Sequence, residues 1–470
     1  MSFEGIHSVH LLGIGGIGMS ALARWFAHEG YAVSGYDRTP SALTDELSKE
    51  GMTVNFEDTL EAIPAAVKSE PASSLIIWTP AMPKDSIQLN YFRDNGYQLK
   101  KRSEVLGMVT SSFYTIAVAG THGKTTTSSM IAHVLKSAGK PVAAFLGGIT
   151  QNYQSNLILG DKKSKEPVLV VVEADEFDRS FLTLHPNEVV VTSADPDHLD
   201  IYGDEATILD GFRQFIQLID KKGKLYIQHT AADRLGAENL PKVMTKEYGL
   251  RSSGITAANI QARTGSFVFD YQDLNHTIKG LELFIPGFHN VENALAAIAI
   301  ALDHQISEEQ IRKGISSFKG VKRRFEIHVN EGNQVFIDDY AHHPEEIRAC
   351  LSSVRAMFPT KKLTVIFQPH LYTRTRDFAS GFSESLSLAD SVILLDIYPA
   401  RELPIEGVNA EMLLENIQTS KKELVGKEEL LAHLEQANPE VLVTLGAGDI
   451  DRLVPRIASW MREKQNHISL

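Results

Sequence analysis

The feature that most constrains this chain is a short apolar strand that runs into a glycine-rich loop and then into a helix. Residues 114–119 form the apolar run, and the loop that follows reads Gly120-Thr121-His122-Gly123-Lys124-Thr125-Thr126. In such a loop, backbone N–H groups surround phosphate oxygens, the lysine reaches the β- and γ-phosphates, and the first hydroxyl after it can bind Mg²⁺. The segment therefore predicts a nucleoside triphosphate site.

One position departs from the usual pattern of a phosphate loop. Val118 stands five positions before Gly123, where a glycine is normally found, so the first glycine of this loop is Gly120. The flanking sequence still supports the motif, because residues 125–138 place apolar side chains on one helical face and Gly139 stands at the expected C-cap. We therefore interpret the segment as a variant phosphate loop.

A second glycine-rich loop lies near the N-terminus. A strand at residues 7–12 leads into Gly13-Ile14-Gly15-Gly16-Ile17-Gly18 and a helix, and a second strand at 31–36 ends at Asp37. This spacing of glycines, with a carboxylate about 20 residues later, indicates a Rossmann-like unit that holds a diphosphate at a helix N-terminus. NAD, FAD and nucleotide-sugars all suit this geometry. Thr79, in a loop after a later strand, is a further candidate contact.

The length of the chain predicts several domains. At 470 residues it exceeds what a single hydrophobic core usually holds. We expect an α/β protein of three domains: a Rossmann-like domain at 1–107, a central phosphate-loop domain with a mixed sheet at 108–320, and a Rossmann-like domain at 321–470. In the last of these, strands alternate with helices and polar residues follow the strands, as in an open parallel sheet.

Charge and cysteine content narrow the class of protein. A net charge of −13 argues against nucleic acid as a partner, because a phosphate backbone would be repelled. The single cysteine, Cys350, allows no intrachain disulfide and fits a reducing, cytoplasmic compartment. No apolar stretch approaches the roughly 18 residues of a membrane-spanning helix, so we expect no membrane insertion.

Polar residues after the strands of the middle segment are candidate ligands. Glu173 follows a buried apolar run, where a Mg²⁺ ligand is expected beside a phosphate loop, although a solvated acidic turn gives the same pattern. His198 follows the next strand as a second metal ligand or an ordinary capping histidine. Asn290 and Asn293 begin an alanine-rich helix, either as caps or as contacts to a nucleotide.

The motifs, in their order along the chain, resemble those of the Mur ligases, the ATP-dependent amide-forming enzymes of peptidoglycan precursor synthesis. The resemblance extends from Gly13 to Asp449 and includes both glycine-rich loops. It also includes the segments 173–176, 197–200, 289–294, 323–326, 338–344, 367–376 and 446–450.

Within this family the details are most similar to the member that adds the first amino acid. The resemblance implies that L-alanine is joined to UDP-N-acetylmuramate through an acyl phosphate, with ATP and two Mg²⁺ ions. We expect the protein to be a monomer or a homodimer. It implies that the N-terminal loop (Gly15, Gly16, Ile17, Gly18), Asp37 and Thr79 hold the UDP-sugar.

The resemblance also implies roles for the remaining motif residues. Lys124 would neutralise the γ-phosphoryl group, while Thr125, Glu173 and His198 would be metal ligands. His342 or His343 would deprotonate or orient the amine, and Arg374 and Arg376, with Tyr340, would bind the amino acid, since a guanidinium fork suits a carboxylate. ATP would be bound by Gly120, Thr121, His122, Gly123, Lys124, Thr125, Thr126, Asn290, Asn293, Arg324 and Asp339.

Two positions differ from the family pattern. Leu371 stands where many relatives carry arginine, so more of the grip on the alanine carboxylate is expected from Arg374 and Arg376. Arg213 stands roughly where sister ligases carry a carbamylated lysine, and we predict no such lysine here.

Three other functions fit parts of the sequence but not all of it. A recycling ligase that attaches a whole tripeptide to the same UDP-sugar shares both glycine-rich loops. An NAD-dependent oxidoreductase would leave the phosphate loop unexplained. A non-catalytic nucleotide switch would leave the amide-ligase motifs without use, and no guanine-specifying Asn-Lys-x-Asp run is found in the sequence.

Overall fold

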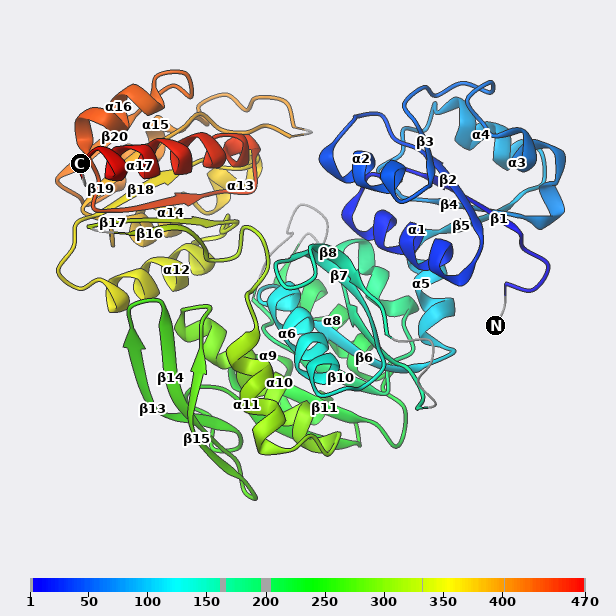
Figure 1. The fold of residues 1–470 in the computed structure, drawn as a ribbon, viewed down its shortest axis with the longest axis horizontal. Coiled ribbons are helices and arrows are strands. Elements are labelled where there is room, and N and C mark those ends of the chain that lie inside the picture. Colours follow the sequence, from blue (N-terminus) through cyan, green and yellow to red (C-terminus); the bar gives the residue numbers. More distant parts are fainter. Residues whose placement is uncertain (1–2, 161–165, 196–203, 332, 401, 469–470) are drawn as a thin grey trace. The chain divides into compact units, whose positions relative to one another are not determined.

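The computed structural model describes residues 3–160, 166–195, 204–331, 333–400 and 402–468, and its helices and strands are labelled in Figure 1. The chain divides into two compact units. The first comprises Met1–Thr256, Asp273–Asn275 and Asn293–Gly314, and the second comprises Ala257–Gln272, His276–Glu292 and Ile315–Leu470.

The first unit begins with a five-stranded sheet of order β3-β2-β1-β4-β5, in which every neighbouring pair is parallel. Its strands are β1 (Ser8–Leu12), β2 (Ala32–Tyr36), β3 (Thr53–Asn55), β4 (Ser74–Trp78) and β5 (Gln98–Lys101). The helices between them are α1 (Ile17–Glu29), α2 (Ala42–Lys49), α3 (Ala65–Ser69), η1 (Pro71–Ser73), α4 (Ile87–Asp94) and α5 (Arg102–Thr110). This is the Rossmann-like pattern that the N-terminal sequence predicts.

The first unit also holds a seven-stranded sheet of order β12-β11-β10-β6-β9-β7-β8, mixed because only the β7–β8 pair is antiparallel among the described pairs. Its strands are β6 (Tyr114–Ala119), β7 (Val142–Thr150), β8 (Ser155–Ile158), β9 (Leu169–Glu173), β10 (Glu188–Val191), β11 (Lys224–Gln228) and β12 (Met244–Tyr248). The accompanying helices are α6 (Lys124–Ser137), η2 (Phe177–Thr183), α8 (Glu205–Ile216), α9 (His229–Leu235) and η3 (Ala237–Asn239). The predicted mixed central sheet is confirmed.

The second unit contains two sheets. The smaller has the order β13-β14-β15, formed by β13 (Thr256–Arg263), β14 (Ser266–Gln272) and β15 (Thr277–Leu283). The larger has the order β16-β17-β21-β18-β19-β20, formed by β16 (Glu326–Glu331), β17 (Gln334–Asp339), β18 (Leu363–Phe367), β19 (Ser391–Leu394), β20 (Lys421–Leu424) and β21 (Val441–Leu445). Its β16–β17 pair is antiparallel, so this sheet is mixed and the expectation of a purely parallel sheet is wrong at that edge.

Helices of the later part of the chain connect these strands. Helix α10 (Phe288–Asp303) passes from the second unit into the first and is followed by α11 (Glu308–Ser317). The others are α12 (Pro344–Met357), α13 (Tyr372–Asp377), α14 (Ala379–Leu386), α15 (Glu411–Asn416), α16 (Leu430–Ala437), η4 (Asp449–Arg452) and α17 (Val454–Ile468). The predicted α/β class is therefore confirmed, while the domain boundaries at residues 107 and 320 stay predictions.

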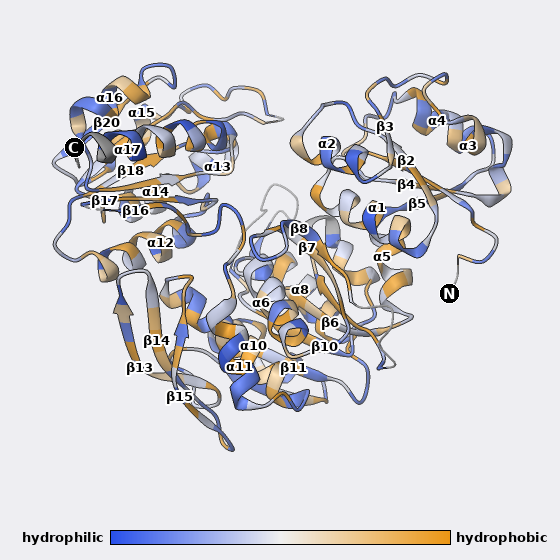
Figure 2. Cartoon of the chain, viewed as in Figure 1, coloured by the Kyte–Doolittle hydropathy of each residue, from blue (hydrophilic) through white to orange (hydrophobic). Residues whose placement is uncertain are grey.

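Many strands of the central sheet consist largely of apolar residues, which Figure 2 colours orange. In the first unit a single apolar cluster includes Leu11 and Phe26 of the N-terminal sheet region together with Phe181 and Phe212 of the central region. Burial of apolar surface contributes roughly 25 cal/mol per Å², so this shared core fixes the two sheets of the first unit to each other.

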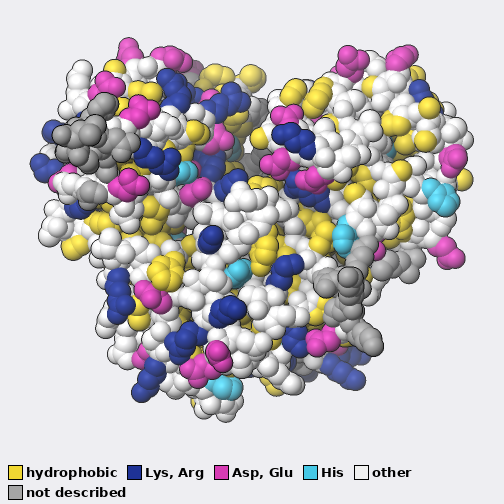
Figure 3. Space-filling view, viewed as in Figure 1, with side chains coloured by type: hydrophobic (Ala, Val, Ile, Leu, Met, Phe, Trp, Pro, Cys, Tyr) yellow, Lys and Arg dark blue, Asp and Glu magenta, His cyan; other side chains and the backbone are white. Residues whose placement is uncertain are grey.

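The distribution of surface charge and the length of the helices can be compared with those of nucleic-acid-binding and membrane-spanning proteins. On the face shown in Figure 3, acidic and basic side chains are interspersed and no single basic region dominates. Among the residues that the structure describes, no helix has the length and apolar character needed to cross a bilayer.

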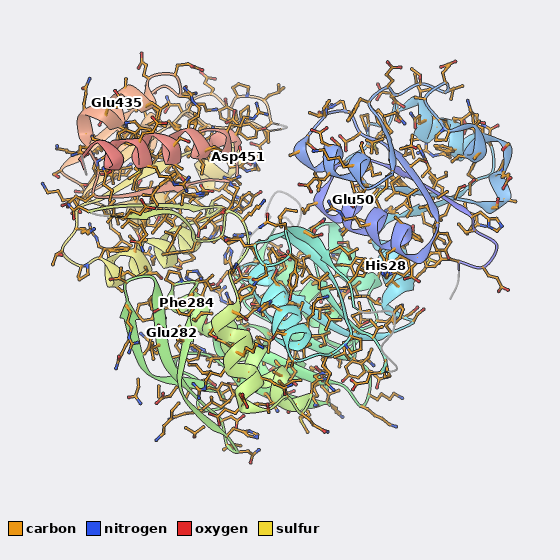
Figure 4. The ribbon with its side chains drawn as sticks, in the orientation of Figure 1. His28, Glu50, Glu282, Phe284, Glu435 and Asp451 are labelled. Carbon is orange, nitrogen blue, oxygen red and sulfur yellow. The ribbon has the colours of Figure 1, made fainter. Side chains whose placement is uncertain are left out.

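A buried polar network joins helix α1 to the central sheet. The side chain of Asn156, on β8, donates to the carbonyl oxygen of Ile17 and, over 2.9 Å, to Ser20 Oγ, and its oxygen accepts from Arg24 Nη1. Arg24 also binds Glu50 (labelled in Figure 4) through Nη2 at 2.7 Å. Because Asn156 is fully buried and binds Ile17, Ser20 and Arg24, the helix that follows the N-terminal glycine loop has a fixed register on β8.

The replacement Asn156→Ala tests this network. It removes a hydrogen-bond partner of the buried Ser20 and Arg24 side chains. Leaving one buried polar group unsatisfied lowers the free energy of unfolding by about 1–3 kcal/mol. We expect the free energy of unfolding of the first unit to fall by that amount in urea titrations. Asn275, an exposed asparagine of the same unit, is the control, and Asn275→Ala is expected to change the free energy of unfolding by less than about 0.5 kcal/mol. Equal effects would contradict the assignment.

Candidate functional site

The phosphate loop is shaped by close contact with the end of strand β10. Gly120 has a φ of +140°, and a Cβ atom there would lie 2.1 Å from Thr192 Oγ1. Thr192 donates its hydroxyl to Ala119 O over 3.1 Å and also to His122 O, and Ser193 Oγ accepts the His122 N–H over 2.8 Å. Only glycine therefore fits at position 120. This contact accounts for the first glycine of the variant loop, which has Val118 at the position of the usual first glycine.

The rest of the loop follows the predicted arrangement. Gly123 has a φ of +80° and precedes helix α6, which begins at Lys124. Thr121 Oγ1 lies 2.9 Å from Ser193 Oγ and accepts the Asp195 N–H over 3.1 Å. Thr126 is buried in the first turn of α6. The N-terminus of α6, with its partial positive charge, therefore faces the phosphate loop, where an anion can bind.

The side chain of Lys124 folds back over this loop. Its ammonium donates to Gly120 O over 2.5 Å and to Glu176 Oε1 over 2.9 Å. Glu176 is almost fully buried, with 2% of its side chain exposed. Sequence reasoning passed over Glu176, which is one of four carboxylates in the run 173–178, because only the tertiary fold singles out the one that reaches the lysine.

The ionisation of this pair is perturbed by burial. Burial by itself lowers the pKa of Lys124, but the nearby carboxylates of Glu176, Asp175 and Glu173 outweigh it and raise the pKa above its usual value. Burial raises the pKa of Glu176 to about 7, although Lys124 acts in the opposite direction. Lys124 is therefore a cation at neutral pH, while the negative charge of Glu176 varies near neutral pH.

Two oxygen ligands suited to Mg²⁺ lie beside the loop. Thr125 Oγ1 donates to Glu173 Oε1 over 2.9 Å, and Gly147 N donates to Glu173 Oε2 over 2.8 Å. Hydroxyl and carboxylate oxygens are the donors that this hard cation prefers, so the predicted residues fit a magnesium ion. A Cβ at position 147 would lie 2.5 Å from Glu173 Oε2, so the glycine lets this carboxylate lie directly against the backbone.

The third predicted metal ligand, His198, lies outside the described residues. Within the described parts of the chain, no group of three or more His, Cys, Asp and Glu side chains is arranged to hold a metal ion. The metal ligands therefore remain a prediction that rests on Thr125 and Glu173.

The N-terminal glycine loop is brought together with two of its predicted partners. Gly15 N donates to Asp37 Oδ2 over 2.8 Å. A Cβ on Gly13 would lie 2.9 Å from Thr79 Cγ2, so Thr79 stands against the loop. Gly16 and Ile17 follow, and helix α1 begins at Ile17. The loop, Asp37 and Thr79 form one cluster at the carboxyl ends of β1, β2 and β4.

Arg102 is a functional candidate that sequence reasoning missed. A Cβ on Gly18 would lie 2.9 Å from Arg102 Nη1, and Arg102 Nη2 lies 3.9 Å from Asp175 Oδ2. The guanidinium therefore lies between the N-terminal glycine loop and the acidic run that also supplies Glu176. The only sequence signal was the basic run Lys100-Lys101-Arg102 at the end of β5.

The two asparagines at the start of α10 fall in different units. Asn293 lies in the first unit, where its Oδ1 atom is 3.0 Å from the place that a Cβ on Gly123 would occupy. Asn290 lies in the second unit and donates its side-chain amide to Pro286 O over 2.8 Å. Asn293 thus lies against the phosphate loop, whereas Asn290 stabilises the start of its own helix.

In the second unit, the segment 323–346 gathers several predicted residues. The guanidinium of Arg324 lies 4.9 Å from the ring centre of Tyr340. Both oxygens of Asp339 accept backbone N–H groups, from Phe325 and Ala341, each over 2.8 Å. Burial raises the pKa of Asp339 to about 7 in spite of the opposing charge of Arg324.

The two adjacent histidines have different surroundings. His342 Nδ1 lies 3.2 Å from Glu346 Oε2 and 3.1 Å from Tyr340 O. His343 is the N-cap of α12, its Nδ1 accepts the Glu345 N–H over 3.4 Å, and its ring packs on Phe378. The structure thus sets the Nδ1 atom of His342 against a carboxylate and that of His343 against a backbone N–H.

The two predicted carboxylate-binding arginines are not placed alike. Arg374 is buried, whereas Arg376 is exposed and donates to Asp377 Oδ1 over 2.7 Å. Residues two positions apart on a helix do not share a face. Leu371, where relatives were expected to carry arginine, is buried with a φ of +70° and donates its N–H to Tyr398 O over 3.0 Å.

Comparison with known protein families covers most of the chain. Three family profiles match in succession: "Mur ligase family, catalytic domain" at residues 8–114, "Mur ligase middle domain" at 118–301, and "Mur ligase, glutamate ligase domain" at 323–448. Their order follows the three successive α/β segments of the chain.

Individual relatives are similar over nearly their whole length. The chain is 47% identical to a UDP-N-acetylmuramate–L-alanine ligase of Flavobacterium psychrophilum, over 99% of this chain and 100% of that protein. It is 49% identical to the ligase of the same name from Porphyromonas gingivalis, over 97% of this chain and 99% of that one.

Solved structures show the same architecture. The UDP-N-acetylmuramate–alanine ligase of Thermotoga maritima superimposes with a TM-score of 0.78 at 28% identity, covering 97% of this chain and 99% of that one. A murein peptide ligase of Psychrobacter arcticus gives a TM-score of 0.69 at 23% identity, with 96% and 98% covered. At that identity the second likeness shows the fold alone.

The replacement Glu176→Gln tests the buried pair at the phosphate loop. At pH 8 it removes a negative charge that competes for Lys124, and relief of about 1 kcal/mol of repulsion corresponds to roughly fivefold tighter binding. We expect calorimetry with a non-hydrolysable ATP analogue to show this gain. As the pH falls from 8 to 6, Glu176 takes up a proton, which should tighten binding by the unmodified protein relative to binding by the variant. The terminal phosphate of the analogue titrates equally with both proteins, so the difference between their pH profiles isolates Glu176.

Glu166→Gln is the matched control, since Glu166 is an exposed carboxylate that also pairs with a lysine, Lys140. It should leave both the affinity and its pH dependence unchanged. Weaker binding by Glu176→Gln, with the pH dependence intact, would contradict the role given to Glu176.

Proposed function

Because this chain belongs to the Mur ligase family, we propose that it joins L-alanine to UDP-N-acetylmuramate while ATP is converted to ADP and phosphate. The relatives that share nearly half of its residues over their full length carry that activity in their names. The reaction belongs to peptidoglycan synthesis, and we assign it to the cytoplasm, where ATP is available.

The observation that carries the proposal is the presence of two phosphate-binding loops in one compact unit. The N-terminal loop suits the diphosphate of a nucleotide-sugar, and the loop at Gly120–Thr126 suits the triphosphate of ATP. Arg102 lies beside the first loop and close to the acidic run next to the second. An enzyme that transfers a phosphoryl group from ATP to a sugar nucleotide must bind both of these anions.

Activation of the carboxylate is the chemical problem. An amine does not displace oxygen from a carboxylate at neutral pH, whereas an acyl phosphate has a good leaving group. Phosphoryl transfer depends mainly on positioning and on neutralising charge. Lys124, held as a cation by the surrounding carboxylates, supplies positive charge for the γ-phosphoryl group, and the N–H groups of the loop bind its oxygens.

Thr125 and Glu173 would hold Mg²⁺, and we keep the proposal of a second ion with His198 as a further ligand. When bound, such ions neutralise the two anions that must approach each other. Gly147 N holds Glu173 in position by donating to its other oxygen. Asn293 and Gly123 define the adjoining wall of the phosphate loop.

For the sugar nucleotide we propose the N-terminal cluster. Gly15, Gly16, Ile17 and Gly18 would supply N–H groups to the diphosphate, with Thr79 at their side. Asp37, which accepts from Gly15 N, would fix the shape of the loop. Arg102 adds positive charge beside Gly18, which suits an anionic diphosphate.

The remaining candidate residues lie in the second unit. We propose Asn290, Arg324 and Asp339 for ATP, and Tyr340, His342, Arg374 and Arg376 for the amino acid. Arg374 is the stronger candidate for the alanine carboxylate, because it is buried and a desolvated guanidinium binds a carboxylate more strongly than an exposed one.

The replacement Lys124→Ala tests the phosphate loop. Without the ammonium, the γ-phosphoryl charge is not neutralised, and we expect phosphate release in the presence of all three substrates to fall by about 10³-fold or more. Binding of UDP-N-acetylmuramate by calorimetry should stay within about twofold of the unmodified enzyme. Lys140→Ala, which removes a partly exposed lysine beyond the other end of α6, is the control and should keep full turnover.

Choice of amino acid tests the substrate assignment. Phosphate release with ATP, Mg²⁺ and UDP-N-acetylmuramate is expected to depend on L-alanine, with much lower rates for a tripeptide or for larger amino acids. Mass spectrometry of the product identifies the amide. Preference for the tripeptide would assign the chain to recycling instead, and phosphate released equally without any amino acid would contradict a ligase.

A further inference from the structure

Glu346 is a largely buried carboxylate that contacts two residues assigned to different substrates. It lies in the first turn of α12, with 12% of its side chain exposed. Its Oε1 atom lies 3.6 Å from Arg324 Nη1. Its Oε2 atom accepts the His342 backbone N–H over 3.0 Å and lies 3.2 Å from His342 Nδ1. The side chain therefore fixes His342 at two points.

The contacts of His342 determine where its proton lies. Both neighbours of Nδ1, Glu346 Oε2 at 3.2 Å and Tyr340 O at 3.1 Å, are hydrogen-bond acceptors. Nδ1 must therefore carry a hydrogen in order to bond with either of them. In the neutral ring Nε2 then carries no hydrogen and has a lone pair, so it is the basic atom.

His343 has contacts of a different kind. Its Nδ1 accepts the N–H of Glu345 at the start of α12, and its buried ring packs against Phe378. These contacts are those of an N-cap. The carboxylate at Nδ1 that characterises an oriented general base is found at His342.

Other titratable and charged groups surround His342. The ring of His370 lies 6.2 Å away, centre to centre, and the ring of Tyr340 lies 5.2 Å away. Arg324 packs over Tyr340, and Asp339 precedes it on β17. Among these groups, Glu346 is the carboxylate that the structure places within hydrogen-bond distance of the His342 ring.

We propose that Glu346 is a positioning residue that holds His342 so that Nε2 removes a proton from the ammonium group of the incoming amino acid. This inference rests on the proposed function. To that function the inference adds Glu346 as the residue that orients the base, and it identifies the base as His342 rather than His343. The same carboxylate holds Arg324, so that the group assigned to ATP and the base are fixed by one side chain.

The proton and electron pairs balance over the step. Nε2 takes one proton from the ammonium, and the imidazolium that results is stabilised by Glu346 at Nδ1. The nitrogen lone pair forms a C–N bond to the acyl carbon, and the C–O bond to the phosphate breaks with its electron pair on the phosphate oxygen. The second proton leaves the nitrogen to solvent, which completes the amide.

An acceptor that needs no base separates this role from a structural one. Hydroxylamine is already neutral at pH 7 and captures an acyl phosphate as a hydroxamate. For Glu346→Gln and Glu346→Ala, at saturating ATP and UDP-N-acetylmuramate, we expect kcat with L-alanine to fall at least about tenfold. Hydroxamate formation should stay within about twofold. The deficit with L-alanine should shrink at alkaline pH, where more of the amino acid is neutral.

Glu345→Gln is the matched control, because Glu345 is the adjacent exposed carboxylate and pairs only with Arg348 among its described ion pairs. It should change neither rate. An equal fall of both rates in the Glu346 variants would overturn the proposal, since Glu346 would then act through Arg324 or through folding. Unchanged kcat with L-alanine would overturn it as well. Absence of hydroxamate and amide with the unmodified enzyme would instead contradict the proposed ligase function.

Discussion

The contact between Gly120 and the end of strand β10 is the constraint on which the phosphate loop depends. With a Cβ excluded by Thr192 Oγ1, the chain can turn directly from β6 into α6, and the hydroxyls of Thr192 and Ser193 bind the loop from the neighbouring strand. The position of Lys124 follows from that turn. A substitution at Gly120 would therefore displace the loop, the lysine and the helix together.

Charge around the loop is balanced by tertiary contacts. The acidic run beginning at Glu173 places several carboxylates beside the loop proposed to bind a triphosphate, which is itself strongly negative. Lys124 pairs with Glu176, and Arg102 approaches Asp175 from helix α5. These cations compensate part of the negative charge, and they are also the groups that a triphosphate must share with the carboxylates. The site is thus preformed in geometry while its charge pairs are available for exchange.

Local sequence was sufficient to predict the parts of this site that lie on one continuous segment. The phosphate loop, its helix and the N-terminal βαβ unit depend on glycine spacing and apolar periodicity, and all three are present. Glu176, Arg102 and Asn156 were missed because their roles depend on partners that are distant in the sequence, as for Asn156 and Arg24. The antiparallel β16 was missed because its short run carries no pattern that gives its direction.

The network of Asn156, Arg24 and Ser20 also has a consequence for recombining this protein with its relatives. It makes the β7–β8 hairpin, which belongs to the central sheet, a structural partner of the first helix of the chain. A chimaera joined near residue 107 would separate that helix from the hairpin with which it is matched. Chimaeras that receive the N-terminal region together with the hairpin should fold more often than those that receive the N-terminal region alone. The segments that must be exchanged together are therefore discontinuous along the chain.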